Sequence, residues 1–232
     1  MKNLRSRITG RQSGFTLVEI AIVLVIIGLL LVGVLQGQEM IENTKVKSVV
    51  SDMKAIQAAY NGYVDRYKTL PGDEAVGTYT ARGWANTVGG NANGTLAAAV
   101  GVTFTNAAGE NQAFWQSLRA SGLLSGTVTD VLVAALPKHA LGGTIGVAVG
   151  APTVYGLAGT FVCASNLTTK QAAAIDTMID GPLPATNIGN DIGNVRGATG
   201  AALLAPVAGT PAGLAYNEAV TTTTWTLCMR IG

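Results

Sequence analysis

Few side chains in this sequence could do chemistry, and Glu19 has the least ordinary surroundings among them. It is the only charged residue between Phe15 and Leu35, a stretch rich in Ile, Leu and Val. A carboxylate in such a stretch is costly inside a membrane, on the order of 2–3 kcal/mol at the bilayer centre and less near the edge. Charged groups in these positions are functional by default, so we expect Glu19 to have a specific partner.

The other candidates for catalysis or metal binding have simpler explanations. His139, the only histidine, has no reactive Ser or Cys context, and we expect it in a surface loop. With one His and two Cys, a zinc cage is excluded by number. Acidic residues that could serve hydrolysis or Ca²⁺ binding lack EF-hand spacing; they are Asp73, Glu74, Asp176, Asp180 and Asp191. We expect Asp176 and Asp180 on the solvent face of a short helix, and predict no enzyme activity, cofactor or metal.

The charge distribution argues against nucleic acid as a partner. Only 12% of the residues are charged, about half the share in an average soluble domain. The net charge of +2 depends on residues 1–14, which hold four basic side chains and no acidic one, and residues 15–232 alone sum to −2. No basic stripe with interleaved aromatic residues follows, so we expect no nucleic-acid surface.

The elements that must position Glu19 begin with a membrane-spanning helix. Residues 15–37 are long enough to cross a hydrocarbon core of roughly 30 Å, and the preceding basic residues favour a cytoplasmic N-terminus. A cleaved secretory signal peptide is the alternative. It is disfavoured because the apolar stretch is longer than usual and no A-x-A site follows it.

The helix is expected to continue beyond the membrane. From residue 38 to 68 the apolar residues recur at intervals of three and four, which is typical of one face of an amphipathic helix. The pattern ends at Leu70-Pro71-Gly72-Asp73, where Pro and Gly stop a helix. We therefore predict one helix over residues 15–68 whose amphipathic half packs on the rest of the chain.

The residues around Glu19 carry a specific resemblance. Gly14-Phe15-Thr16-Leu17-Val18-Glu19, after a short basic leader, resembles the class III signal of type IV prepilins and pseudopilins. The resemblance implies that a prepilin peptidase cuts after Gly14 and methylates the new amine of Phe15. It also implies that Glu19 neutralises that amine in a neighbouring subunit. Many type IV pilins have a Pro about twenty residues into this helix, where this chain has Gln36-Gly37.

The physical chemistry of the pair agrees with that expectation. Cleavage would create an ammonium at Phe15, one helical turn from Glu19. A carboxylate and an ammonium are each costly to bury alone and are tolerated together. Between subunits, such a pair would also set their register.

The region from residue 69 to 232 is expected to form an α+β head. Two stretches read as short helices that end near Gly122 and Gly181, with Thr168 and Gln171 as a possible capping box in the second. Its buried face is expected to comprise Ala172, Ile175, Met178 and Ile179. Strand signals cover 144–149, 154–164, 195–199 and 221–231. We predict a pilin-like fold, with a long N-terminal helix packed on a C-terminal antiparallel sheet.

Cys163 and Cys228 lie in two of the expected strands. In an exported head a disulfide is their natural state, and it would stabilise the head by roughly 4 kcal/mol in the chain-entropy model. The pair also resembles the disulfide that pins the C-terminal region of many pilins. Two buried free thiols remain the alternative.

Three functional hypotheses follow. The leading one, from the resemblance, is a major or minor type IV pilin with residues 1–14 removed, residues 15–68 as the assembly helix and residues 69–232 as the head. Its expected partners are copies of itself or other pilins, the prepilin peptidase, the inner-membrane assembly machinery and membrane lipid. The head would be periplasmic before assembly and at the cell surface afterwards. The alternatives are a pseudopilin of a type II secretion system and a membrane-tethered envelope enzyme or binding protein.

Overall fold

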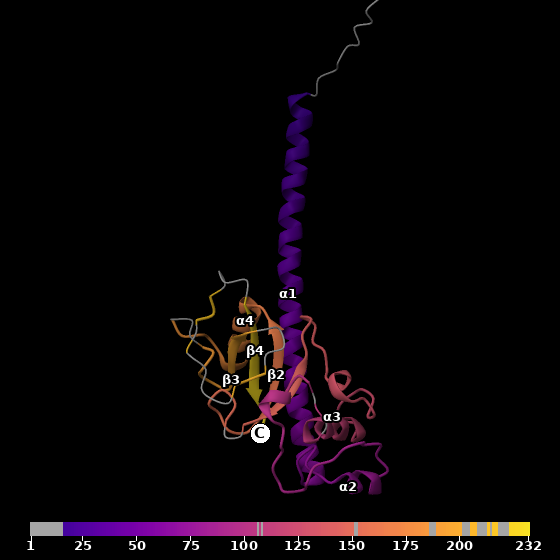
Figure 1. The fold of residues 1–232 in the computed structure, drawn as a ribbon. Helices are drawn as coiled ribbons and strands as arrows, with labels where there is room; N and C mark the ends of the chain where they lie inside the picture. Colours follow the sequence, from indigo (N-terminus) through magenta and orange to yellow (C-terminus); the bar gives the residue numbers. More distant parts are fainter. Residues whose placement is uncertain are drawn as a thin grey trace, which may run out of the picture. The chain divides into compact units, whose positions relative to one another are not determined.

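The structure is a computed structural model that describes residues 16–105, 107, 109–150, 153–185, 189–200, 205–207, 213, 215–217 and 223–232. The chain divides into two compact units, Met1–Asn43 and Thr44–Gly232. Helix α1 (Leu17–Tyr67) contributes residues to both units (Figure 1). The expected long helix is therefore present and unbroken across Gly28, Gly33 and Gly37.

Helix α1 ends where the sequence predicts. Lys68 adopts a positive φ of 59°, while its N–H donates to the Val64 carbonyl at 2.8 Å, as in a left-handed helix C-cap. Gly72 follows with a φ of 96°, and a Cβ there would lie 2.7 Å from the backbone nitrogen of Phe114. Only glycine satisfies both conditions, so Gly72 lets the chain turn directly against helix α3 (Glu110–Ala120).

The head contains a four-stranded antiparallel sheet in the order β1-β2-β4-β3. Its strands are β1 (Ile145–Val149), β2 (Thr160–Leu167), β3 (Val195–Gly200) and β4 (Thr224–Arg230). The expected α+β architecture is confirmed. The strand predicted over 154–164 was wrong in its first part, because Val154 and Leu157 form an isolated bridge around a turn and Gly159 has a φ of 124° before β2 begins.

The two faces of the sheet are covered differently. One face shares a core with the second half of α1, which contributes Val49, Met53, Ile56 and Tyr63, all at most 2% exposed. The opposite face carries the two cysteines and is covered by Phe104 and Tyr155. Side chains alternate between these faces along β2, as a strand buried on both sides requires.

Short helices complete the head: α2 (Val76–Ala81), the 3₁₀ turns η1 (Val100–Val102) and η2 (Leu132–Ala135), α3, and α4 (Thr169–Asp180). The capping box predicted at α4 is confirmed, with Thr168 and Gln171 exchanging hydrogen bonds. Ala172 and Ile175 are buried as expected, but Met178 is 40% exposed, so its prediction was wrong. Met178 lies on the solvent side of α4, whereas the next residue, Ile179, is partly buried and packs against the core.

Candidate functional site: the apolar half of helix α1

The first part of α1 presents apolar side chains on every side. All large aliphatic residues from Leu17 to Ile41 are between 46% and 86% exposed. This is the one helix among the described residues that is long and apolar enough to cross a membrane, and none of its most apolar segment is buried within the chain. Such a surface needs lipid or other apolar helices around it, because water would impose a large transfer cost.

Glu19 lies in the first turn of this helix and forms a capping box with Thr16. The Thr16 N–H and hydroxyl donate to Oε2 of Glu19 at 3.2 and 3.3 Å, and the Glu19 N–H donates to Oγ1 of Thr16 at 3.2 Å. Thr16 is thus the N-cap and Glu19 the third helical residue. The arrangement satisfies two N–H groups that the helix start leaves without intrahelical partners.

This geometry leaves Glu19 able to bind a cation. Its side chain is exposed, and Oε1 has no hydrogen-bond partner within the part of the chain that the structure describes. The carboxylate also lies at the N-terminal end of the helix, where the helix dipole is positive. Gly14 and Phe15, the expected cleavage and methylation positions, lie outside the described residues.

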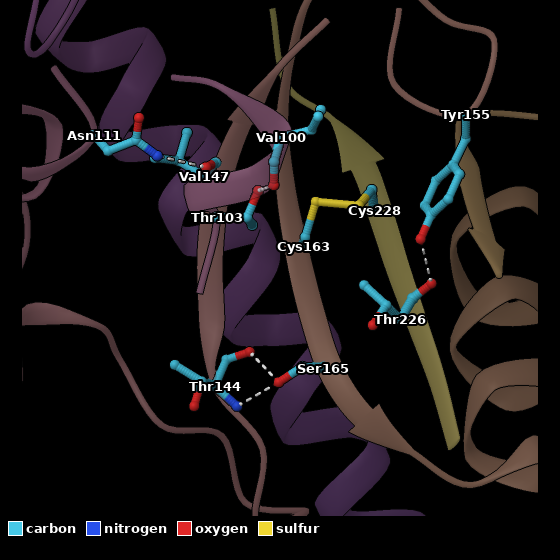
Figure 2. Close-up of a disulfide and its surroundings, with 10 residues drawn as sticks. All are labelled: Val100, Thr103, Asn111, Thr144, Val147, Tyr155, Cys163, Ser165, Thr226 and Cys228. Carbon is cyan, nitrogen blue, oxygen red and sulfur yellow. Dashed lines mark hydrogen bonds between the residues drawn. A yellow bond between two sulfur atoms is a disulfide. The ribbon is translucent and has the colours of Figure 1, made fainter. Parts of the chain in front are cut away.

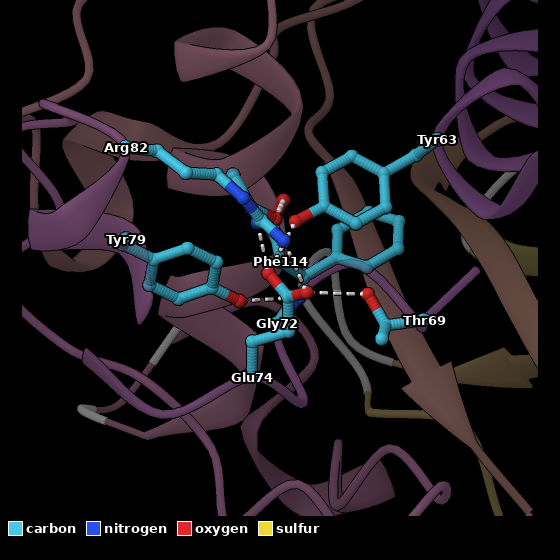
Figure 3. Close-up of polar contacts among 8 residues, drawn as sticks. Tyr63, Thr69, Gly72, Glu74, Tyr79, Arg82 and Phe114 are labelled. Carbon is cyan, nitrogen blue, oxygen red and sulfur yellow. Dashed lines mark hydrogen bonds and ion pairs between the residues drawn. The ribbon is translucent and has the colours of Figure 1, made fainter. Parts of the chain in front are cut away.

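The second half of α1 is attached to the head by a buried carboxylate, Glu74 (Figure 3). Thr69 and Arg82 donate to its Oε1 at 2.7 and 2.8 Å, and the Tyr63 hydroxyl donates to Oε2 at 3.1 Å. A second Arg82 nitrogen contacts Oε2, which makes the ion pair bidentate. The Arg82 guanidinium also lies 4.7 Å from the ring centre of Tyr67, at the end of α1.

The electrostatics of this cluster favour a charged Glu74. Burial alone would raise the pKa of Glu74, but the hydrogen bonds from Arg82 and Thr69 and the Arg82 charge bring it below its ordinary value. Burial, together with the nearby Glu74 charge, raises the pKa of Tyr79 to about 12, and its hydroxyl accepts a hydrogen bond from the Gly72 N–H at 3.2 Å. The cluster holds the chain reversal after α1 in place and has the features of a structural support.

The disulfide between Cys163 and Cys228 is present in the structure and joins directly opposed residues of β2 and β4 (Figure 2). Both cysteines are at most 1% exposed. Thr103 and Tyr155 lie on the same face, and the Tyr155 hydroxyl donates to the Thr226 carbonyl at 3.4 Å. The bridge therefore fixes the centre of the sheet beneath a covered surface.

The surface position expected for His139 was wrong. Its side chain is 4% exposed, with Nε2 2.9 Å from the Ser165 carbonyl and Nδ1 accepting the Leu141 N–H at 3.3 Å. The carbonyl partner places the proton on Nε2, and burial lowers the pKa of the imidazole. One nitrogen ties the loop of His139 to strand β2 and the other bonds within that loop. Both nitrogens of the imidazole therefore have partners within the head.

The solvent position expected for Asp176 was also wrong, whereas Asp180 is exposed as expected. Asp176 is 2% exposed and accepts a hydrogen bond from the Tyr216 hydroxyl at 2.7 Å. Desolvation raises its pKa to about 6, against the opposite effect of that hydrogen bond. Asp180 accepts the Val195 N–H at 2.7 Å and so ties α4 to β3.

Sequence reasoning missed three of these contacts. The Thr16–Glu19 pair follows the same spacing as the capping box that was identified at α4, so that signal was present in the sequence. The pairing of Glu74 with Arg82 and the burial of Asp176 depend on tertiary contacts and have no local signal. Within the described ranges, no three His, Cys, Asp or Glu side chains are grouped so as to hold a metal ion.

Comparison with known proteins identifies the N-terminal segment. Residues 9–35 match the family model of the prokaryotic N-terminal methylation motif, which is the signal of type IV pilins and pseudopilins. The matched residues include the Gly14-Phe15 peptide, the Thr16–Glu19 capping box and much of the apolar half of α1. No curated protein and no solved structure matches the chain.

Proposed function

Because residues 9–35 carry the methylation signal of type IV pilins and pseudopilins, we propose that this chain is a structural subunit of a bacterial type IV pilus. It is cleaved after Gly14, N-methylated at Phe15 and polymerised through the apolar half of α1. The observation that carries the proposal is the combination of a helical segment whose apolar side chains are exposed on every side with one accessible carboxylate in its first turn. The role is structural and requires no cofactor.

The Glu19 carboxylate has a defined task in this proposal. The capping box leaves one carboxylate oxygen for the Phe15 amine of an adjacent subunit, and the exposed aliphatic side chains supply the contact area between helices. Pairing removes two isolated charges from an apolar environment, which favours the register in which they meet. Before assembly, lipid surrounds the same helix and the head lies in the periplasm, where the disulfide is expected to persist.

The test is a comparison of Glu19→Gln with Glu39→Gln in cells that assemble the filament. Glu39 lies in the same helix, so its substitution controls for the loss of one acidic side chain. We expect Glu19→Gln to be cleaved and inserted normally but to be absent from sheared surface filaments, while Glu39→Gln assembles. Normal incorporation of the Glu19→Gln chain would contradict the proposed role of Glu19.

Processing is tested separately. N-terminal sequencing of the mature chain is expected to begin at N-methylated Phe15, and a bulky substitution at Gly14 is expected to leave the leader attached. The location of the mature protein then distinguishes a type IV pilin from a pseudopilin of a type II secretion system. Recovery in sheared surface filaments supports a pilin, and retention of the processed protein in the envelope during active type II secretion indicates a pseudopilin.

A further inference from the structure

A separate chemical arrangement lies in the exposed loop after α2, at Asn93-Gly94. The amide carbon of an asparagine can be attacked by the backbone nitrogen of the following residue, which closes a five-membered succinimide ring and expels ammonia. Glycine at the second position offers the least hindrance, because it has no Cβ and tolerates unusual backbone angles. Gly94 has a φ of 80°, and open space surrounds the position of a Cβ.

The attacking nitrogen is hydrogen-bonded to a carboxylate. The Gly94 N–H donates to Oδ2 of Asp73 at 2.8 Å, and the Asn93 N–H donates to Oδ1 of the same residue at 3.1 Å. Asp73 is 3% exposed, so its carboxylate is held in a fixed position within the head. A carboxylate at this distance from the N–H that must lose its proton has the geometry of a general base.

The amide under attack is hydrogen-bonded on the oxygen that would become negative. Oδ1 of Asn93 accepts the Thr95 N–H at 2.9 Å and the Thr95 hydroxyl at 2.7 Å. The first of these bonds forms an Asx turn, which folds the side-chain amide over the peptide between Asn93 and Gly94. Two donors aimed at a developing oxyanion stabilise a tetrahedral intermediate.

We propose that Asn93-Gly94 is a self-modification site of the folded head, with Asp73 and Thr95 as the groups that promote the reaction. The Gly94 nitrogen bonds to Cγ of Asn93 as its proton passes to Asp73. The C–N bond of the side-chain amide then breaks, and the departing nitrogen takes up that proton and leaves as ammonia. Water opens the succinimide at either carbonyl, which yields aspartate or isoaspartate at position 93. Water is the one co-reactant, and no oxidant or reductant is needed.

The chain contains two internal controls. Asn61-Gly62, the only other Asn-Gly peptide in the sequence, lies inside α1, where the Gly62 N–H belongs to the helical hydrogen bonding and the Asn61 side chain is exposed. Asn91 forms a similar Asx turn, with its Oδ1 accepting the Asn93 N–H at 3.1 Å, but Ala92 follows it. Asn61 has the same Asn-Gly dipeptide as Asn93 but lies in a helix. Asn91 has the same Asx turn as Asn93 but is not followed by glycine.

The experiment incubates the full-length protein in detergent at neutral pH and follows three peptides by mass spectrometry, with isoaspartate measured by enzymatic methylation. We expect Asn93 to convert at least about tenfold faster than Asn61 or Asn91. Asp73→Asn removes the base and is expected to slow conversion on the order of tenfold or more. Thr95→Val removes one donor to the oxyanion and is expected to slow it by a smaller factor.

Two further measurements keep the test decisive. Near-ultraviolet circular dichroism shows whether each variant retains the native head, and Thr95→Val serves as the independent variant should Asp73→Asn fail to fold. Denatured protein provides the reference for the same peptide without Asp73 and Thr95 in place. The proposal is overturned if native Asn93 reacts more slowly than denatured Asn93, or if folded Thr95→Val and folded Asp73→Asn both react at the native rate.

Discussion

From Leu17 to Ile41, helix α1 exposes every large aliphatic side chain by 46% or more, whereas its large aliphatic side chains from Val46 to Ile56 are at most 7% exposed. The backbone conformation is the same in both halves. The difference lies in patterning, because the first half is apolar all round and the second has one apolar face. A helix with one apolar face can be satisfied by its own chain, but a helix that is apolar all round needs other molecules on every side.

The carboxylates associated with the two halves of α1 also differ in whether their partners lie within the chain. Glu74, which supports the second half, has its oxygens engaged by Arg82, Thr69 and Tyr63 within the chain. Glu19, in the first half, uses one oxygen in a local cap and is exposed. The charge of Glu74 is thus paired within the head, whereas the charge of Glu19 is available to a partner outside the chain.

Removing the disulfide is expected to have the largest effect that distinguishes the head from the first half of α1. Replacing Cys163 and Cys228 together by Ala is expected to lower the free energy of unfolding of the head by about 4 kcal/mol, because the unfolded chain loses a long-range constraint. Denaturant unfolding followed by Trp fluorescence measures this, since all three Trp residues lie in the head. The first half of α1 is expected to stay helical in detergent. Rapid labelling of these thiols in native, reductant-treated protein would contradict their observed burial.

Two methionines in α1 test the comparison directly. Met53 is 0% exposed and Met40 is 71% exposed. Met53→Ala is expected to destabilise the head by about 3 kcal/mol through lost burial and a cavity. Met40→Ala is expected to change it by less than about 0.5 kcal/mol. Both substitutions change helix propensity by the same amount, so the denaturant midpoints of the two variants report the difference in burial. Equal midpoints would show that the burial of Met53 does not stabilise the head.

The regular elements were predictable because they leave a periodic pattern. The apolar stretch around Leu24, the one-sided spacing from Val46 to Tyr63 and the Thr168–Gln171 cap each act over a few residues of chain, and the structure contains all of them. The sequence singles out Glu19 for a similar reason, since a lone charge in an apolar stretch is visible without tertiary information.

The remaining features depend on contacts between distant segments. The sequence around His139 reads as a polar loop, and its burial results from Ser165 on β2 lying beside it. Asp176 has helix neighbours on a polar side, and Tyr216, forty residues away, covers it. No local pattern encodes such pairs, so the sequence predicts a surface position for short polar segments in a head rich in Gly, Thr and Asn.

Asp176 gives a smaller, pH-dependent prediction for the head. Its folded pKa of about 6 exceeds the ordinary 3.8, so the folded state binds the proton more tightly. Its contribution to stability is therefore greatest at low pH, declines as pH rises from about 4 to 6, and stays low above that. Asp176→Asn is expected to raise stability at pH 7 by about 2 kcal/mol and to remove this slope.

The measurement is the difference between wild-type and Asp176→Asn unfolding free energies across this pH range. His139 acts in the opposite direction, because its lowered pKa makes stability fall as pH decreases below about 6.5. Its effect is common to both proteins and cancels in the difference. A difference that does not change with pH would show that Asp176 titrates normally.

The capping box at the start of α1 gives the smallest expected effect and bears on the N-terminal half alone. Thr16→Val keeps the shape of the side chain but removes the hydroxyl that bonds Glu19, and is expected to destabilise the first helical turn by about 1 kcal/mol. Thr16→Ser retains the hydroxyl and serves as the control. Amide hydrogen exchange in detergent should therefore accelerate around Val18 and Glu19 in Thr16→Val only, with the head unchanged. Equal exchange in both variants would mean that the cap does not hold Glu19, and the carboxylate would then meet the proposed partner amine without local restraint.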